Sequence, residues 1–295
     1  MAYPFIDALT GRWISAQGQL IPADSPEAQD YYAPTERKMY YEVIRLVQGV
    51  PLFWEDHMIR LTHSVGGEMT IPSSLYTESM ALIRENCLKE ANLRLVLTKE
   101  TRIIHLTPSY YPDETLIREG VPTGILVWER TDPNTKIIRS DYKSAVAERF
   151  AQPGPFGSCF ELLLADHQGY LTEGSRSNLF FIRGSKVLTP PDDRVLKGIT
   201  RQYIVQAIAE AGLTLQIGML TLKDLQKDPA ITAFISASPI DLLPVRAIDN
   251  LVMTSAQDQS FQNIRAAYMK IVNTYIQDRR LSKNGHPVDS AGYGR

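Results

Sequence analysis

A lysine at position 143 stands between two different patterns in the 295-residue sequence. Before it runs an alternating apolar stretch, TKIIRSDY, which predicts a strand, and after it runs SAVAERFAQ, which predicts a helix. Because the end of a strand is a rigid mount, an amine fixed there can attack a carbonyl carbon and form a Schiff base. A lone lysine is more often a simple surface residue, so the interpretation depends on other groups.

Two further features suit a phosphate group. The stretch LKGITRQYIV predicts a helix that starts after Gly198, where the N–H groups of Ile199 and Thr200 would favour an anion. Arg60, within HMIRL, lies on another predicted helix and offers a planar fork of donors. Each feature also has an ordinary interpretation, as a threonine-capped helix and as a solvated or salt-bridged arginine.

An acid completes the set. Glu173 lies where a predicted strand ends, in YLTEGSRSNLFF, and could be a turn residue or could hold a proton on a ring nitrogen. An amine, phosphate donors and such an acid are together what pyridoxal phosphate requires, because the protonated ring accepts electrons from a substrate carbanion. The combination therefore predicts a pyridoxal phosphate site.

The composition narrows the class of protein. A net charge of −2 and a hydrophobic fraction of 44% are typical of a soluble globular chain and give no basic surface for nucleic acid. No apolar stretch is long enough to span a membrane, and MAYPFIDALTGRW does not resemble a signal peptide. Cys87 and Cys159 form no metal-like cluster, so we expect free thiols, no metal site and a cytoplasmic location.

The elements that must position these groups predict an α+β fold in two domains. Residues 1–118 mix strands and helices and predict a small α/β domain, with a hairpin at MYYEVIRLV and PLFW. The Pro- and Gly-rich stretch PSYYPDETLIREGVPTG predicts the connection. Residues 119–295 predict a larger, mainly antiparallel domain that carries Lys143, with helices at TRQYIVQAIAEAG and at about 256–280.

From about residue 5 to residue 280 the sequence resembles the class IV aminotransferases, which are the fold type IV enzymes that use pyridoxal phosphate. The resemblance is most specific in SDYKSAVA followed by TEGSRSNLFF, in LTPPDDRVLKGITR, and in AFISASPIDLLPVRAID. The first half is similar through YYEVIRLVQGVPLFWEDHMIRL. The resemblance implies a homodimer with its active site near the subunit interface, and amino acids and 2-keto acids as substrates.

The resemblance also implies a role for each candidate residue. Lys143 would carry the cofactor and then move the proton between the substrate Cα and the cofactor carbon. Glu173 would pair with the pyridine nitrogen, and Arg60 would bind the phosphate. The remaining residues implied are the phosphate contacts Ile199, Thr200, Ser238 and Arg176, the ring contacts Asn178 and Leu196, and the substrate-facing Tyr41.

Three functions stay open from the sequence. An amino acid aminotransferase leads, and TEGSRSN and DYKS favour D-amino acids slightly. A lyase of the aminodeoxychorismate lyase type would use the same fold and cofactor, but would need no keto-acid acceptor. A scaffold that has lost turnover is the third, because PTERKMYYEV lacks the glycines that the family commonly has before this strand.

Overall fold

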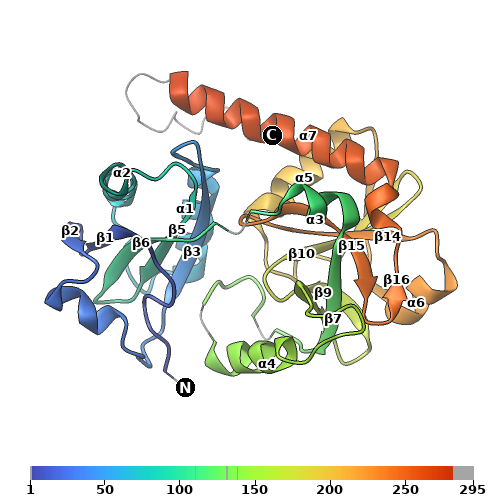
Figure 1. Ribbon diagram of the computed structural model, residues 1–295, viewed down its shortest axis with the longest axis horizontal. Coiled ribbons are helices and arrows are strands. Elements are labelled where there is room, and N and C mark those ends of the chain that lie inside the picture. The colour runs from blue at the N-terminus through green and yellow to red at the C-terminus, as the bar shows by residue number, and fades with distance from the viewer. Residues whose placement is uncertain (1, 110, 131, 138, 282–295) are drawn as a thin grey trace. The chain divides into compact units, whose positions relative to one another are not determined.

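A computed structural model describes residues 2–109, 111–130, 132–137 and 139–281 of this α+β protein (Figure 1). Contacts divide the chain into two units. Unit 1 comprises Met1–Tyr110, Thr135–Ser140 and Val272–Arg295, and unit 2 comprises Tyr111–Asn134 and Asp141–Ile271. The sequence predicted a single domain boundary between residues 118 and 119. The two units defined by contacts each combine several segments of the chain, so that boundary stays a prediction.

Unit 1 is built on a six-stranded sheet with the strand order β2-β1-β6-β5-β3-β4. Its neighbouring strands pair antiparallel, and the predicted hairpin forms between β3 and β4. The strands are β1 (Thr10–Ala16), β2 (Gln19–Pro22), β3 (Tyr40–Val47), β4 (Val50–Pro51), β5 (Ala91–Leu97) and β6 (Arg102–Thr107), and the helices are η1 (Pro26–Tyr31), α1 (Trp54–Val65) and α2 (Leu75–Asn86).

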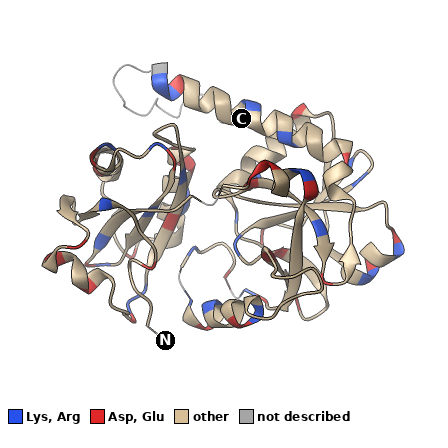
Figure 2. Cartoon of the chain, in the orientation of Figure 1, with Lys and Arg blue, Asp and Glu red and all other residues tan. Residues whose placement is uncertain are grey.

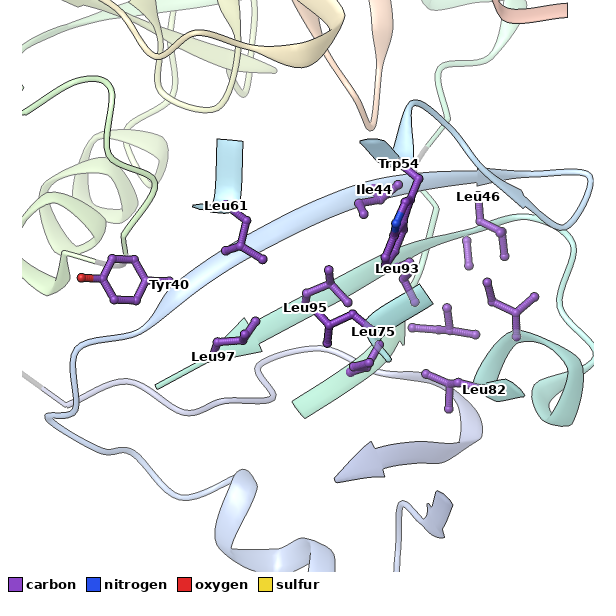
Figure 3. Close-up of a cluster of buried hydrophobic side chains, with 14 of the residues drawn as sticks. Tyr40, Ile44, Leu46, Trp54, Leu61, Leu75, Leu82, Leu93, Leu95 and Leu97 are labelled. Atoms are coloured by element: carbon purple, nitrogen blue, oxygen red, sulfur yellow. The ribbon is translucent and has the colours of Figure 1, made fainter. Parts of the chain in front are cut away.

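Alternation along β3 explains which face of this sheet is buried. Tyr40, Glu42 and Ile44 are buried while Tyr41 and Val43 between them are partly exposed, as the period of two in a strand requires. The apolar members pack against leucines of β5 and of the two helices, including Leu61 (Figure 3). Glu42 is thus a charged residue on a face that otherwise enters the core.

Unit 2 contains a ten-stranded sheet whose main path is β12-β11-β10-β14-β15-β7-β8-β9-β13, with β16 paired to β15. Most of its pairings are antiparallel, as predicted, whereas β7 pairs parallel with both β8 and β15, and β11 pairs parallel with β12. The strands are β7 (Val121–Val127), β8 (Glu161–Ala165), β9 (Tyr170–Gly174), β10 (Asn178–Arg183), β11 (Lys186–Thr189), β12 (Thr214–Ile217), β13 (Leu220–Thr221), β14 (Thr232–Ala237), β15 (Asp241–Ile248) and β16 (Leu251–Val252).

The helices of the second half include three that the sequence predicted, α4 (Ser140–Phe150), α5 (Ile199–Glu210) and α7 (Gln259–Leu281). The others are α3 (Glu114–Glu119), α6 (Leu222–Lys227) and η2 (Ser255–Gln257). The predicted connection is not merely a linker, because it contains α3, which Asp113 caps by accepting from Leu116 N–H at 2.8 Å.

The prediction that Lys143 ends a strand is wrong. Around it, Ile137 makes one isolated antiparallel bridge to Tyr40, and helix α4 already begins at Ser140. Lys143 therefore lies in the first turn of a helix and is partly exposed. Among the residues described in this segment, the alternating pattern forms a single isolated bridge, and the residues that follow adopt a helix instead of extending a strand.

Charged residues of both signs are interspersed along the chain (Figure 2). Both cysteines are free, Cys87 exposed and Cys159 partly buried. Among the residues described, no helix is long and apolar enough to cross a membrane.

Candidate active site

The predicted site residues divide between the two units. Tyr41 and Arg60 belong to unit 1, whereas Lys143, Glu173 and the remaining candidates belong to unit 2.

In unit 2 the hairpin between β9 and β10 brings the predicted acid next to two predicted ring contacts. Glu173 and Asn178 are directly opposite each other in the strand register. Leu196 N–H donates to Oε2 of Glu173 at 3.0 Å, and the Asn178 side-chain amide donates to the Leu196 carbonyl at 2.8 Å. Because Glu173 is 2% exposed, its carboxylate is a buried acceptor held in a fixed direction.

The corner between these strands is held by a second buried acid. Glu161 accepts hydrogen bonds from the hydroxyls of Ser175 at 2.5 Å and Ser177 at 2.9 Å. The Arg176 side chain, 65% exposed, donates to the Phe160 carbonyl at 2.8 Å. In this arrangement Arg176 braces the corner, and its predicted phosphate contact stays a prediction.

The N-terminus of α5 lies beside the same group. Gly198 is its N-cap, no side chain caps the helix, and its first turn has no acidic residue. A Cβ atom at Gly198 would lie only 2.0 Å from Oδ1 of Asn178, so only glycine permits this close approach. The hydroxyls of Thr200 and Ser238 lie 3.4 Å apart, which brings together two predicted phosphate contacts from distant parts of the sequence.

The residue before Lys143, Tyr142, contacts the corner between β9 and β10. The Tyr142 hydroxyl donates to the Ser175 carbonyl at 2.7 Å, and the Tyr142 ring packs against Trp128 with ring centroids 5.5 Å apart. These contacts fix the first turn of α4 to the corner that follows Glu173.

Arg130, which the sequence did not single out, connects the same elements. Its Nε lies 2.8 Å from Oε1 of Glu173, and its Nη2 donates to the Tyr142 hydroxyl and the Ser175 carbonyl, each at 3.3 Å. A guanidinium beside a buried carboxylate offsets the cost of keeping that charge out of water. A cavity of about 220 Å³ opens beside this pair, lined by Glu129, Arg130, Pro133, Thr172, Glu173, Asp193 and Arg194.

In unit 1, Arg60 is held by two groups that the sequence also did not single out. Its Nε and Nη2 donate to the two carboxylate oxygens of Glu42, at 2.8 and 2.5 Å. The Nδ1 atom of His57 lies 2.7 Å from Oε2 of the same carboxylate. Arg60 lowers the pKa of Glu42 to about 2, against the opposing effect of burial.

Tyr41, the predicted substrate-facing residue, is partly exposed on the other face of β3. Cationic groups lie over its ring, with the Arg94 guanidinium 5.6 Å and the Lys136 ammonium 4.7 Å from the ring centroid. Positive charge at this position suits a carboxylate ligand.

The sequence does contain a pattern from which the cluster around Arg60 could have been predicted. Glu42 interrupts the inward-facing positions of a clearly alternating strand, and a buried acid requires a partner. His57 and Arg60 are three residues apart on a helix, so they share one face. Arg130 and Tyr142 carry no such signal, because their contacts depend on how distant strands pair.

The donor set in unit 2 fits the phosphate and the ring nitrogen of pyridoxal phosphate. Uncapped helix N–H groups and two hydroxyls suit the phosphate, and a buried carboxylate opposite Asn178 in the strand register suits a protonated nitrogen. Helix α5 begins three residues after Leu196, so one short segment carries both the groups that would hold the phosphate and a contact of the acid that would face the ring nitrogen.

The chain is similar to known aminotransferases in sequence and in fold. The model of the family "Amino-transferase class IV" matches residues 39–248. A putative branched-chain-amino-acid aminotransferase of Methanocaldococcus jannaschii is 27% identical over 237 residues, covering 74% of this chain and 81% of that protein. The D-alanine aminotransferase of Listeria monocytogenes is 28% identical over 236 residues, covering 72% and 78%. The solved branched-chain amino acid aminotransferase of T.th., with pyridoxamine 5'-phosphate, has a TM-score of 0.74 at 19% identity and covers 90% of this chain and 96% of its own.

The chain therefore belongs to the class IV aminotransferase family. It is a pyridoxal-phosphate-dependent transaminase, and its substrates are amino acids and 2-keto acids.

Proposed function

We propose that this enzyme moves an amino group between an amino acid and a 2-keto acid, with Lys143 as the catalytic amine and Glu173 as the acid facing the ring nitrogen. The observation that supports this assignment is the buried Glu173 carboxylate, held by Leu196 three residues before α5 begins. Pyridoxal phosphate, when bound, supplies a carbonyl for the amine and a ring that accepts electrons.

The residues divide the work by their chemistry. The Nζ atom of Lys143 moves a proton to and from the substrate Cα, and Glu173 keeps a proton on the ring nitrogen. The N–H groups of Ile199 and Thr200 bind the phosphate, because a helix N-terminus favours an anion. In unit 1, Arg60 is the proposed charged donor to a phosphate.

Further groups complete the proposed site. Asn178 and Leu196 line one edge of the ring, and their mutual hydrogen bond fixes that edge. Tyr41 faces the substrate, and the remaining proposed phosphate contacts are Ser238 and Arg176. The proposed substrate is an amino acid, with a slight preference for the D form, and the working enzyme is a homodimer, which light scattering of the purified protein tests.

A panel of L- and D-amino acids, with and without 2-keto acids, tests the function. We expect the visible absorbance of the purified holoenzyme to fall with an amino acid alone, and to recover when a keto acid is added. A product that accumulates without any keto acid would favour the lyase. Absorbance that no amino acid changes would favour a scaffold that has lost turnover.

A further inference from the structure

The Glu42–His57–Arg60 cluster of unit 1 is buried more deeply than a surface salt bridge would be. Glu42 is 0% and His57 1% exposed, and the Arg60 side chain is 10% exposed. The three residues come from β3 and from successive turns of α1, so the core of unit 1 fixes both supports of the cluster. A charged group this far from water needs a fixed partner.

We propose that Glu42 and His57 are positioning residues, which hold the Arg60 guanidinium in the orientation that receives a phosphate. This inference rests on the proposed function, in which Arg60 is a phosphate ligand. Glu42 and His57 would hold Arg60 in one orientation, so that it binds a phosphate selectively and does not act as a mobile cation.

The fork between Arg60 and Glu42 sets the plane of the guanidinium. A guanidinium has five N–H donors in one plane, and the two contacts to Glu42 use Nε and Nη2. Fixing these two atoms fixes the direction of the other donors. An arginine held in this way loses less conformational freedom when it binds an anion than an arginine on a free side chain.

His57 holds the carboxylate in turn. Because the Glu42 carboxylate only accepts, the Nδ1 atom of His57 donates to Oε2 at 2.7 Å, and this contact selects the ring orientation. Burial, with the positive charges of Arg60 and Lys136, lowers the pKa of His57 although Glu42 acts against them. A neutral imidazole therefore orients the carboxylate without adding a charge beside the phosphate.

Two physical effects of Glu42 on phosphate binding oppose each other, and this opposition makes the proposal testable. Its negative charge offsets part of the attraction between Arg60 and an anion, so a purely electrostatic role means that Glu42→Gln binds phosphate more tightly. Its fork orients Arg60, so a positioning role means that the same variant binds phosphate less tightly. A merely structural role lowers stability without changing the preference for phosphate.

The ratio of the affinities for pyridoxal phosphate and for pyridoxal isolates the contribution of the phosphate. We expect Glu42→Gln to lower this ratio by about tenfold, equal to the loss of one charge-assisted hydrogen bond. Glu78→Gln is the matched control, because Glu78 makes a similar fork to Arg102 in the same unit, with both contacts at 3.0 Å. Its ratio should stay within about twofold of the parent ratio.

Variants of His57 keep the proposal testable if Glu42→Gln does not fold. His57→Asn can place an amide donor near the position of Nδ1 and should retain most of the ratio, whereas His57→Leu should lower it. An unchanged or higher ratio in Glu42→Gln, or equal ratios in the two His57 variants, would overturn the positioning role. A parent protein that binds both ligands equally would instead show that the proposed phosphate role of Arg60 is wrong, and the inference would fall with it.

Discussion

Replacing Glu173 by glutamine removes one charge from the centre of the proposed site and leaves its shape almost unchanged. The glutamine oxygen can still accept from Leu196 N–H, which now lies 3.0 Å from Oε2. What the variant loses is the opposite charge that stabilises a protonated ring nitrogen. The change therefore acts mainly on the step in which electrons move from the substrate Cα into the ring, and little on cofactor binding.

The expected magnitude follows from the burial of this carboxylate. At 2% exposure, solvent screens its charge little, so we assign ~3 kcal/mol to the interaction, the upper end for a hydrogen bond to a charged group. A loss of ~3 kcal/mol in the transition state slows the reaction about a hundredfold.

Stopped-flow absorbance of the holoenzyme with a single amino acid measures this half-reaction directly. Glu129→Gln is the matched control, because Glu129 lines the same cavity but is 40% exposed and pairs with Arg194. We expect the control to react within about twofold of the parent rate, since exposed ion pairs contribute little. A Glu173→Gln variant that reacts at the parent rate would show that the charge of Glu173 does not act on the ring nitrogen. A variant that cannot hold the cofactor would assign Glu173 to cofactor binding instead.

Three further predictions concern other groups. Arg130→Met should lower the free energy of unfolding of the cofactor-free protein by ~2 kcal/mol, a value discounted because Arg130 is 22% exposed. Adding Glu173→Gln to the same chain should restore most of this loss, because the carboxylate then no longer needs a partner. Urea titrations that show no such coupling between the two substitutions would contradict the pairing. Burial lowers the pKa of His105 to about 3, so its contribution to stability is complete above the unfolded value of ~6.5 and is lost as pH falls toward 3. As the pH falls between these values, the melting temperature of His105→Gln should therefore fall less than that of the parent protein. Equal decreases in the two proteins would refute this. Arg60→Ala should weaken binding of pyridoxal phosphate by roughly ten- to a hundredfold, and an unchanged dissociation constant would show that Arg60 is not a ligand.

The sequence predicted the parts of the site that depend on local pattern. The corner after Glu173 follows from turn residues between two short strands, and the start of α5 follows from a glycine before an apolar helical stripe. The structure adds that Asn178 and Leu196 meet at this corner, which the strand register makes possible.

What the sequence could not predict depends on pairing between distant segments. The parallel contacts of β7 with β8 and β15 cannot be inferred from the alternation of any one strand, and Arg130 lies three residues after the end of β7. The error at Lys143 has the opposite origin. The segment before it alternates like a strand, but its described residues form a single bridge to a neighbouring strand, so the alternation alone predicted too much strand.

The identity of the catalytic amine tests the proposed active site most directly. Borohydride reduction of the holoenzyme should fix the cofactor covalently to the peptide that contains Lys143, and peptide mapping by mass spectrometry locates the adduct. We expect modification of Lys143 in the parent protein and no adduct at this position in Lys143→Ala. An adduct on another lysine, such as Lys136 or Lys197, would contradict this assignment.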